Sequence, residues 1–313
     1  MVQQMTKAVL KTITGHIRQG HYHGASLALY QKGCWQEYYI GTIDGEQAVK
    51  PGLIYDLASV SKVVGVGTVC LYLLKRHEIE LNKPLKAYYP SFYHSAVTVR
   101  ELLTHTSGID PYIPGRNQMN AAQLQEAINH IAVTPDKAFR YTDINFLLLG
   151  FMLENIYDQS LDRIFQKEVF TPFKMAQTRF GPVREAVPTC KGVTDGRVHD
   201  PKAKTLRNHA GSAGLFSTIK DLEHFLERYL QDDFAADLWH NYGSVKKPRS
   251  LAWNLEGNWL DHTGYTGPFI MVNRQAQQAA VFLTNRTYER DCRSLWIKER
   301  SKIKEAIKSS LTT

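Results

Sequence analysis

Two residues that could carry out acyl transfer stand three positions apart in the segment DLASVSK, residues 56–62. The segment leads from an extended aromatic stretch into an apolar helix, so Ser59 and Lys62 would share one helix face. A serine hydroxyl becomes a nucleophile when a base removes its proton, and a lysine can be that base once its surroundings lower its pKa. The helix start would also offer the Ser59 amide to a developing oxyanion. In the other interpretation, Ser59 or Ser61 caps the helix and Lys62 is solvated.

Two later segments carry further polar groups at the boundaries of apolar elements. In RYTDINFLLLG, Tyr141 and Asp143 precede an apolar helix, where the Tyr141 phenol could transfer protons. In DHTGYTG, residues 261–267, glycines precede an apolar strand and let the backbone approach a ligand closely. A strand edge at this point could bind an acyl group.

In this order, the three segments resemble the SxxK, YxN and [KH]TG motifs of the serine β-lactamase and penicillin-binding protein superfamily, in particular its class C β-lactamase-related, esterase-like branch. The matching positions are Ser59 to Lys62, Tyr141 to Asp143, and His262 to Gly264. Similar segments extend over nearly the whole chain: LLTHTSGI (102–109), GSAGLFSTIKDL (211–222) and VFLTNR (281–286). The ordered matches favour the catalytic interpretation of Ser59 over the capping one.

The resemblance implies a mechanism through an acyl-serine. Ser59 attacks an acyl carbon, Lys62 and Tyr141 take its proton and return one to the leaving group, and water releases the acyl group. The oxyanion hole consists of the amides of Ser59 and Tyr265. The oxyanion and substrate-binding positions together are Ser59, Tyr265, Asp143, His262, Thr263 and Gly264. This chemistry needs no metal and no other cofactor.

Two positions depart from the form usual in β-lactamases. Asp143 stands where the tyrosine motif generally has Asn, and its negative charge would help keep Lys62 protonated. His262 replaces the lysine of KTG and weakens the positive charge that would bind a β-lactam carboxylate. We therefore expect a serine hydrolase acting on a small ester or, second, an amide. The alternatives are a β-lactamase or DD-peptidase (penicillin-binding protein), and a degenerate acyl-binding protein without turnover.

The arrangement of predicted elements indicates an α/β (α+β) protein of β-lactamase/transpeptidase-like fold. An N-terminal helix precedes a hairpin, with a strand at about 26–30 and a turn at Lys32-Gly33, and the chain ends in two apolar runs and a helix at about 293–309. We expect an antiparallel sheet flanked by helices, built from residues 1–60 plus 185–313. A mainly helical domain, 61–184, is inserted, and the site lies in the cleft between the two.

The composition and charge of the chain limit the classes of partner that we expect. The chain has 313 residues, 43% of them apolar, and a net charge of +8. Its basic residues are mostly interleaved with acids, and the dense basic stretch IKERSKIKEAIKSS fits the solvated face of the last helix, so nucleic acid is not expected. The apolar stretches are too short for a membrane span. The expected partner is a small ester, amide or β-lactam-like molecule, and the expected state is a monomer.

The N-terminal segment shows no export signal, so we expect a cytoplasmic location, or an extracellular one if a leader is missing.

The remaining polar residues that could be taken for site residues are interpreted as scaffold. His105 is expected to be structural, Thr218 with Asp221 forms a helix cap, and Asp56 is a local hydrogen-bond acceptor. His21 and His23 lack a third metal ligand, and His199 with Asp200 lines the rim of the site or forms a surface turn. The four cysteines, Cys34, Cys70, Cys190 and Cys292, are expected to be free thiols.

Overall fold

A six-stranded antiparallel sheet forms the centre of the protein, as described for residues 2–311 in the computed structural model. Its strand order is β2-β1-β9-β8-β7-β6, so the first and the last strands of the chain are neighbours. The bounds are β1 Gly24–Gln31, β2 Cys34–Gly41, β6 Asn254–Glu256, β7 Trp259–Thr263, β8 Phe269–Asn273 and β9 Gln278–Leu283. The predicted sheet closed by both ends of the chain is confirmed, and the hairpin turns at Lys32-Gly33 as expected.

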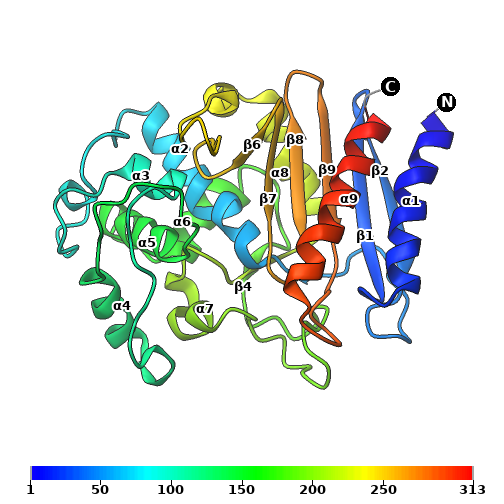
Figure 1. Cartoon of the computed structure of the whole chain (residues 1–313), viewed down its shortest axis with the longest axis horizontal. Coiled ribbons are helices and arrows are strands. Elements are labelled where there is room, and N and C mark those ends of the chain that lie inside the picture. The colour runs from blue at the N-terminus through cyan, green and yellow to red at the C-terminus, as the bar shows by residue number, and fades with distance from the viewer. Residues whose placement is uncertain (1, 312–313) are drawn as a thin grey trace.

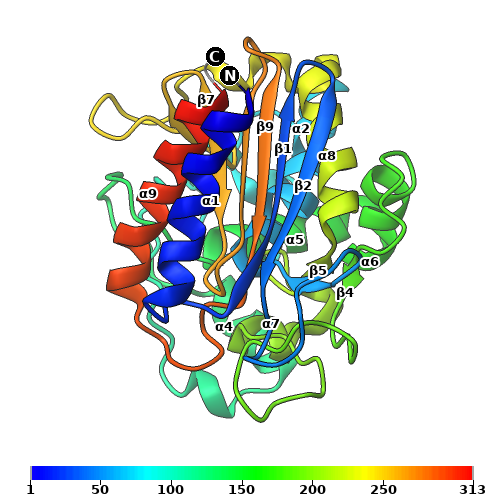
Figure 2. The same cartoon turned by 90° about the vertical axis from the view of Figure 1, so that its right-hand side faces the viewer.

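Helices cover both faces of this sheet. Helices α1 (Val2–Arg18) and α9 (Arg293–Leu311) lie side by side on one face, as Figures 1 and 2 show. Helix α8 (Ile219–Gln231) packs on the other face, against β1, β8 and β9. Because both faces are covered, strands β8 and β9 are buried along their whole length and read as apolar runs.

The middle of the chain is mainly helical, as predicted, and lies beyond α8 from the α1/α9 layer (Figure 1). Its helices are α2 Thr68–Lys75, α3 Val99–Thr104, α4 Ala121–Asn129, α5 Ile144–Tyr157 and α6 Leu161–Phe165. A small three-stranded sheet with the strand order β3-β5-β4 and the short helix α7 complete the fold. Their bounds are β3 Tyr55–Asp56, β4 Arg179–Phe180, β5 Leu215–Ser217 and α7 Pro201–Leu206.

The segment after β3 differs from the regular helix that the sequence suggested. Residues Ala58–Val60 form a 3₁₀ turn, Val63–Gly67 form a π-helical stretch, and only then does the α-helical α2 begin. By length and hydropathy, Ala58–Lys75 could cross a membrane, but 78% of this window is buried inside the protein, as in a core helix. π-helical turns occur frequently at functional sites.

Candidate active site

The turn that carries Ser59 is held from three sides. Leu57 donates its backbone N–H to the carbonyl of Leu215 in β5 at 2.9 Å. The buried Asp56 carboxylate accepts the N–H of Ala58 at 2.8 Å and that of His199 at 2.9 Å. Ala58 has a φ of +45°, a left-handed conformation that a residue with a side chain adopts only at a cost. The Asp56 hydrogen bonds hold this strained backbone directly before Ser59.

Lys62 is fully buried and uses all three of its N–H donors. Its Nζ donates to Ser59 Oγ at 3.0 Å, to Asp143 Oδ1 at 2.7 Å and to the carbonyl of Ser212 at 2.9 Å. Three acceptors match the three donors of an ammonium group. Burial opposes the charge of Lys62, but the Asp143 carboxylate and then Tyr141 raise its pKa above the ordinary value. Lys62 is therefore positively charged at neutral pH when no substrate is bound.

Asp143 belongs to a chain of four alternating charges. Its second oxygen, Oδ2, lies 3.0 Å from the Nζ of Lys202, which in turn lies 3.4 Å from Asp200 Oδ2. Burial alone would raise the pKa of Asp143, but Lys62 and Lys202 together lower it well below the usual range. Asp143 is thus a carboxylate shared by two lysines, and it keeps Lys62 protonated as its place in the sequence suggested.

Tyr141 stands on the loop before α5 and lines the cleft, with 41% of the residue exposed. Lys62 Nζ lies 5.1 Å from the centre of this ring. His105 packs against the loop that carries Tyr141. Its ring centre lies 4.4 Å from that of Tyr141. Its Nδ1 accepts hydrogen bonds from the backbone N–H of Thr142 at 3.4 Å and from the side-chain amide of Asn145 at 2.9 Å. His105 therefore orients the tyrosine loop from a fully buried position, in agreement with its expected structural role.

The edge of β7 passes close to the turn that carries Ser59. A Cβ on Gly264 would lie 2.6 Å from the carbonyl oxygen of Leu57, so only glycine fits between the two backbones. Thr266 donates its hydroxyl to the carbonyl of Asp56 at 3.0 Å, which fixes the β7–β8 turn on the same segment. The His-Thr-Gly motif is thereby held beside Ser59.

His262 does not supply the positive charge of the lysine that it replaces. Its side chain is buried, and its Nδ1 has no hydrogen-bond partner among the described residues. Burial, and then the positive charges of Lys62 and Arg249, lower the pKa of His262 well below its ordinary value. The imidazole is therefore neutral at pH 7.

Tyr265 is held by its side chain and by its carbonyl group. Arg286 donates from Nε to the Tyr265 carbonyl at 2.8 Å, and Asp291 accepts from the Tyr265 hydroxyl while pairing with Arg286. The Arg286 guanidinium lies 4.7 Å from the centre of the Tyr265 ring. The Tyr265 N–H donates no hydrogen bond within residues 2–311, so it can serve an oxyanion.

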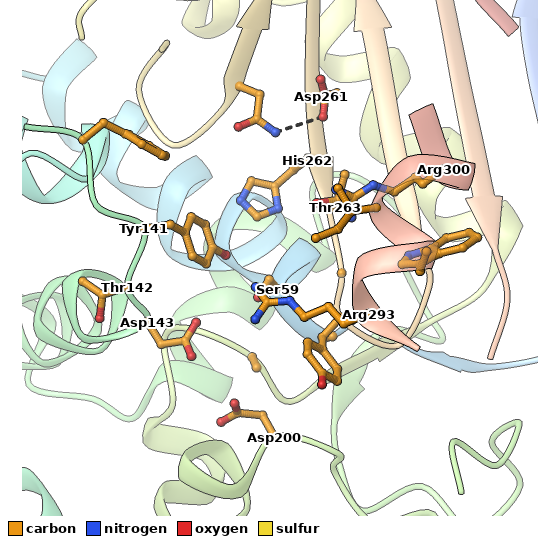
Figure 3. Close-up of a pocket in the computed structure, with 18 of the residues that line it drawn as sticks. Ser59, Tyr141, Thr142, Asp143, Asp200, Asp261, His262, Thr263, Arg293 and Arg300 are labelled. Carbon is orange, nitrogen blue, oxygen red and sulfur yellow. Dashed lines mark hydrogen bonds between the residues drawn. The ribbon is translucent and has the colours of Figure 1, made fainter. Parts of the chain in front are cut away.

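These groups line one cleft of about 1190 Å³. Figure 3 shows Tyr141 and Asp143 on one side of Ser59, His262 above it, and Thr263 from β7 with Arg293 and Arg300 from α9 on the other side. Neither arginine forms an ion pair in the described part of the chain. The α9 side of the cleft therefore presents two arginines that make no direct ion pair of their own.

All the site residues predicted from the sequence line this cleft or contact a residue that does. His199 and Asp200 line it too, which decides between the two interpretations of that segment. Sequence reasoning missed several residues that complete the site, because each is a single charged or small residue without a motif: Lys202, Ser212, Arg249, Arg293 and Arg300. Among residues 2–311, no group of three or more His, Cys, Asp or Glu side chains could hold a metal ion, and all four cysteines are free.

The chain is similar to known proteins over most of its length. The model of the Beta-lactamase family matches residues 4–301. A curated relative from Escherichia coli (strain K12), described as "Putative D-alanyl-D-alanine carboxypeptidase", is 24% identical over 80% of this chain and 73% of its own length.

Solved structures share the fold over nearly the full chain. A Beta-Lactamase/D-Alanine Carboxypeptidase from Pseudomonas syringae has a TM-score of 0.79 at 18% identity and covers 97% of this chain and 98% of its own. EstCE1, described as a hydrolase with promiscuous acyltransferase activity, has a TM-score of 0.78 at 17% identity, with 98% and 99% covered. The match of the family model to nearly all of the sequence shows that this chain belongs to the Beta-lactamase family of serine hydrolases.

Proposed function

We propose that this protein hydrolyses a small ester through an acyl-enzyme formed on Ser59. The observation that carries the proposal is the contact of Ser59 Oγ with a buried, fully hydrogen-bonded Lys62, in a turn strained at Ala58. The Ser59 oxygen forms the new bond to the acyl carbon, and the alcohol leaves with the proton. Water then attacks the acyl-serine and releases the acid.

Tyr141 is the proton acceptor in this proposal. Lys62 already carries three hydrogen-bonded protons, so it cannot take the Ser59 proton without first losing one of them. The Tyr141 ring lies next to Lys62 and faces the cleft, so its hydroxyl oxygen can accept the Ser59 proton while the hydroxyl gives its own proton to the leaving group. Lys62 then acts as a fixed positive charge that favours the negative charge developing on the Ser59 oxygen.

A neutral ester is favoured over a penicillin because the usual lysine is absent from the β7 edge. The buried His262 is neutral and offers no cation to the β-lactam carboxylate, and Asp143 presents a carboxylate where an amide would bind the acyl side chain. Small esters need neither interaction.

The second candidate is a carboxypeptidase acting on short peptides with a free C-terminal carboxylate. Arg293 and Arg300 favour it, because both line the cleft from α9 without an ion pair of their own. The names of the curated relatives point to the same substrate class. In this case the two arginines would replace the lysine of KTG in binding the carboxylate.

The experiment compares p-nitrophenyl acetate turnover with hydrolysis of an acyl-D-alanyl-D-alanine dipeptide and its C-terminal amide. We expect ester turnover that falls on the order of 10⁴-fold or more in Ser59→Ala. Intact-protein mass should show a fluorophosphonate adduct in the wild type and none in Ser59→Ala. Cleavage of the dipeptide acid well above that of its amide would favour the carboxypeptidase instead.

Ser61→Ala is the matched control, because Ser61 lies two residues further on and its hydroxyl accepts the N–H of Leu215 at 3.2 Å. Loss of this buried hydrogen bond should cost about 1 kcal/mol of stability and leave the adduct in place. A durable penicillin adduct without turnover would support a penicillin-binding role. Acylation without turnover by any substrate would support the acyl-binding alternative, and no Ser59-dependent reaction would contradict the proposal.

A further inference from the structure

Asp56 is a buried carboxylate that stands three residues before Ser59, outside the SxxK motif. The residue is 2% exposed, and no cation pairs with it in the part of the chain that the structure describes. A buried carboxylate without a counter-ion lowers the stability of a fold. A local acceptor for one N–H group does not need this charge, because a serine or an asparagine can accept the same bond. The carboxylate therefore requires a further explanation.

Each oxygen of Asp56 holds a different part of the cleft. Oδ1 accepts the N–H of Ala58 at 2.8 Å, in the turn that carries Ser59. Oδ2 accepts the N–H of His199 at 2.9 Å, 143 residues further along the chain. His199 lines the cleft and begins the segment that leads into α7. Two donors from distant segments are bound by two separate oxygens, which a carboxylate has and an asparagine amide does not.

The backbone of Asp56 contacts a third part of the cleft. Its carbonyl accepts the Thr266 hydroxyl at 3.0 Å, and Thr266 directly follows Tyr265. The proposed oxyanion donors are the amides of Ser59 and Tyr265, so residue 56 contacts both of the segments that carry them. A shift of Asp56 would change the distance between the two donors.

The turn that Asp56 holds is strained. Ala58 has a φ of +45°, and a residue with a side chain tends to relax from this left-handed region to the ordinary right-handed one. The hydrogen bond from Ala58 to Asp56 opposes this relaxation, and its charged acceptor makes it about twice as strong as a neutral bond. The position of the Ser59 amide, one residue later, depends on the conformation that Ala58 adopts.

We propose that Asp56 is a positioning residue for acyl transfer. Its carboxylate clamps the strained Ser59 turn to the His199 segment while its carbonyl holds the Tyr265 turn, so that both oxyanion donors face one acyl oxygen. Asp56 acts through these backbone groups, since it does not itself line the cleft. The inference rests on the proposed function, in which Ser59 is acylated.

The clamp requires the ionised form of Asp56. Burial raises the pKa of Asp56 to about 6, the N–H groups of His199 and Ala58 act against burial, and the charge of Asp200 adds to it. Protonation places a hydrogen on one oxygen, and the neutral group accepts hydrogen bonds more weakly. Activity should therefore fall as the pH falls through about 6. Because the pKa in the folded protein lies above that in the unfolded chain, protonation of this group favours the folded state, so the loss is not an unfolding.

Other titratable groups define the background for a pH test. Those around Asp56 come from β3, from the segment before α7 and from the turn after β7 with its partners: Tyr55, His199, Asp200, Tyr265, Arg286 and Asp291. Strand β5, which pairs with β3, carries no ionisable side chain. Four groups of the site keep one charge state near pH 6: Lys62, Asp143, His105 and His262. Burial lowers the pKa of His199 below its ordinary 6.5, so the test must separate His199 from Asp56.

The test measures acylation by p-nitrophenyl acetate in stopped flow between pH 4.5 and 9, in the wild type and in Asp56→Asn. At pH 8 we expect the acylation rate constant of Asp56→Asn to fall on the order of 10²-fold. The apparent Kd for the ester should change little, because Asp56 does not line the cleft. The acid limb near pH 6 should be present in the wild type and absent from Asp56→Asn, whose side chain does not titrate.

Asp221→Asn is the matched control. Asp221 is a second buried carboxylate, whose Oδ2 accepts the backbone N–H of Gln177 at 2.8 Å and the Thr178 hydroxyl at 2.7 Å, away from the cleft. Its rate and acid limb should match the wild type. His199→Gln keeps the backbone N–H that Asp56 accepts, so the acid limb should persist in this variant whatever its absolute rate.

A rescue variant distinguishes positioning from a general loss of structure. Glycine adopts a left-handed conformation without strain, so in Ala58→Gly the Ser59 turn no longer depends on the clamp to the same degree. Ala58→Gly should restore roughly tenfold of the rate that Asp56→Asn loses. A loss that Ala58→Gly leaves unchanged would overturn the positioning role, and so would a wild-type rate in Asp56→Asn.

A second readout does not depend on acylation. In Ser59→Ala protein, the backbone amide NMR signals of residues 58 and 199 should move together with one midpoint near pH 6, and they should still do so after His199→Gln. Signals that stay fixed, or that move with different midpoints, would overturn the clamp. If no Ser59-dependent acylation exists, the proposed function fails, and the positioning role fails with it even when the amides titrate together. If acylation depends on Ser59 but not on Asp56, only the role of Asp56 is overturned.

Discussion

At the scale of single residues, the site is arranged around the charge on Lys62. An Asn at position 143 would accept one hydrogen bond from this ammonium without adding charge. Asp143 instead brings a full negative charge to 2.7 Å from Lys62 Nζ, and Lys202 approaches its other oxygen to 3.0 Å. The positive charge of Lys202 offsets part of the negative charge that Asp143 presents to Lys62. Asp143 and Lys202 should therefore depend on each other.

A double-mutant cycle tests this dependence. Lys202→Met should lower kcat/KM for a neutral ester about tenfold, because the unshared Asp143 carboxylate then holds Lys62 and its protons more tightly. In an Asp143→Asn background the same substitution should have a small effect. The coupling energy should be on the order of 1 kcal/mol or more, since the two side chains are in direct contact.

The control for this cycle is Lys204→Met, which removes an exposed lysine two residues further along α7. It should change neither background. Additive effects of Asp143→Asn and Lys202→Met would show that the two residues act independently, whatever their distance in the structure.

The sequence predicted the local pair but not its partners. Ser59 and Lys62 lie three residues apart, so a single helical turn brings them together, and their 3.0 Å contact follows from spacing. Lys202 and Arg249 reach the site from α7 and from the loop before β6, and nothing in their neighbouring residues marks them. Such residues depend on how distant elements pack, which spacing along the chain does not reveal.

At the scale of elements, the distance between β7 and the Ser59 turn determines the positions of the two proposed oxyanion donors, the amides of Ser59 and Tyr265. The motif glycine, Gly264, is the closest point between them, and its N–H continues the pairing of β7 with a 2.7 Å bond to the Pro268 carbonyl. Pro268 has no N–H to donate to a neighbouring strand, and β8 begins only at Phe269. The backbone of this turn is thus fixed by contacts rather than by a regular ladder.

Gly264→Ala should push the β7 edge away from the Ser59 turn. The new Cβ would meet the Leu57 carbonyl at 2.6 Å and Pro268 Cγ at 2.7 Å, so one of the two backbones must move. A misplacement of about 1 Å costs on the order of 10²-fold in rate, and we expect a loss of that size in kcat for ester hydrolysis. Stopped-flow acylation by p-nitrophenyl acetate would measure it directly.

Gly15→Ala is the matched control, because a Cβ at this position in α1 meets nothing within 4 Å. It should leave the rate unchanged and stabilise the helix by up to about 1 kcal/mol. If Gly264→Ala is acylated at the wild-type rate, the turn relaxes without moving the reactive groups and the expectation is wrong.

The elements themselves follow from the sequence to different degrees. The hairpin β1–β2 and the strands β8 and β9 have clear alternating or apolar patterns with a polar turn between them, and each occurs where predicted. The 3₁₀ and π-helical turns around Ser59 could not be read from the chain. In this segment the side chains of Asp56, Ser61 and Lys62 form hydrogen bonds with backbone groups far away in the sequence, and spacing along the chain does not reveal such contacts.

At the scale of the whole molecule, one hydrophobic core crosses the boundary that the sequence suggested between a sheet domain and an inserted helical domain. The same cluster of buried side chains contains Ala28 of β1 and Val281 of β9 as well as Phe146 and Leu149 of α5. Residues 61–184 therefore do not enclose a core of their own. The division into 1–60 plus 185–313 and 61–184 remains a prediction about chain organisation, and the shared core argues that the two regions unfold together.

Two probes in different regions can test this cooperativity. All five tryptophans lie outside 61–184, so their fluorescence reports the sheet region, whereas the buried Cys70 of α2 reports the helical one. In a protein with the other three cysteines replaced by serine, urea should expose Cys70 to a thiol reagent at the same midpoint at which the fluorescence changes. Reaction of Cys70 at clearly lower urea would show that the helical region opens first. In that case Lys62 and Asp143 could separate from the β7 edge while the sheet stays folded, and activity would be lost before global unfolding.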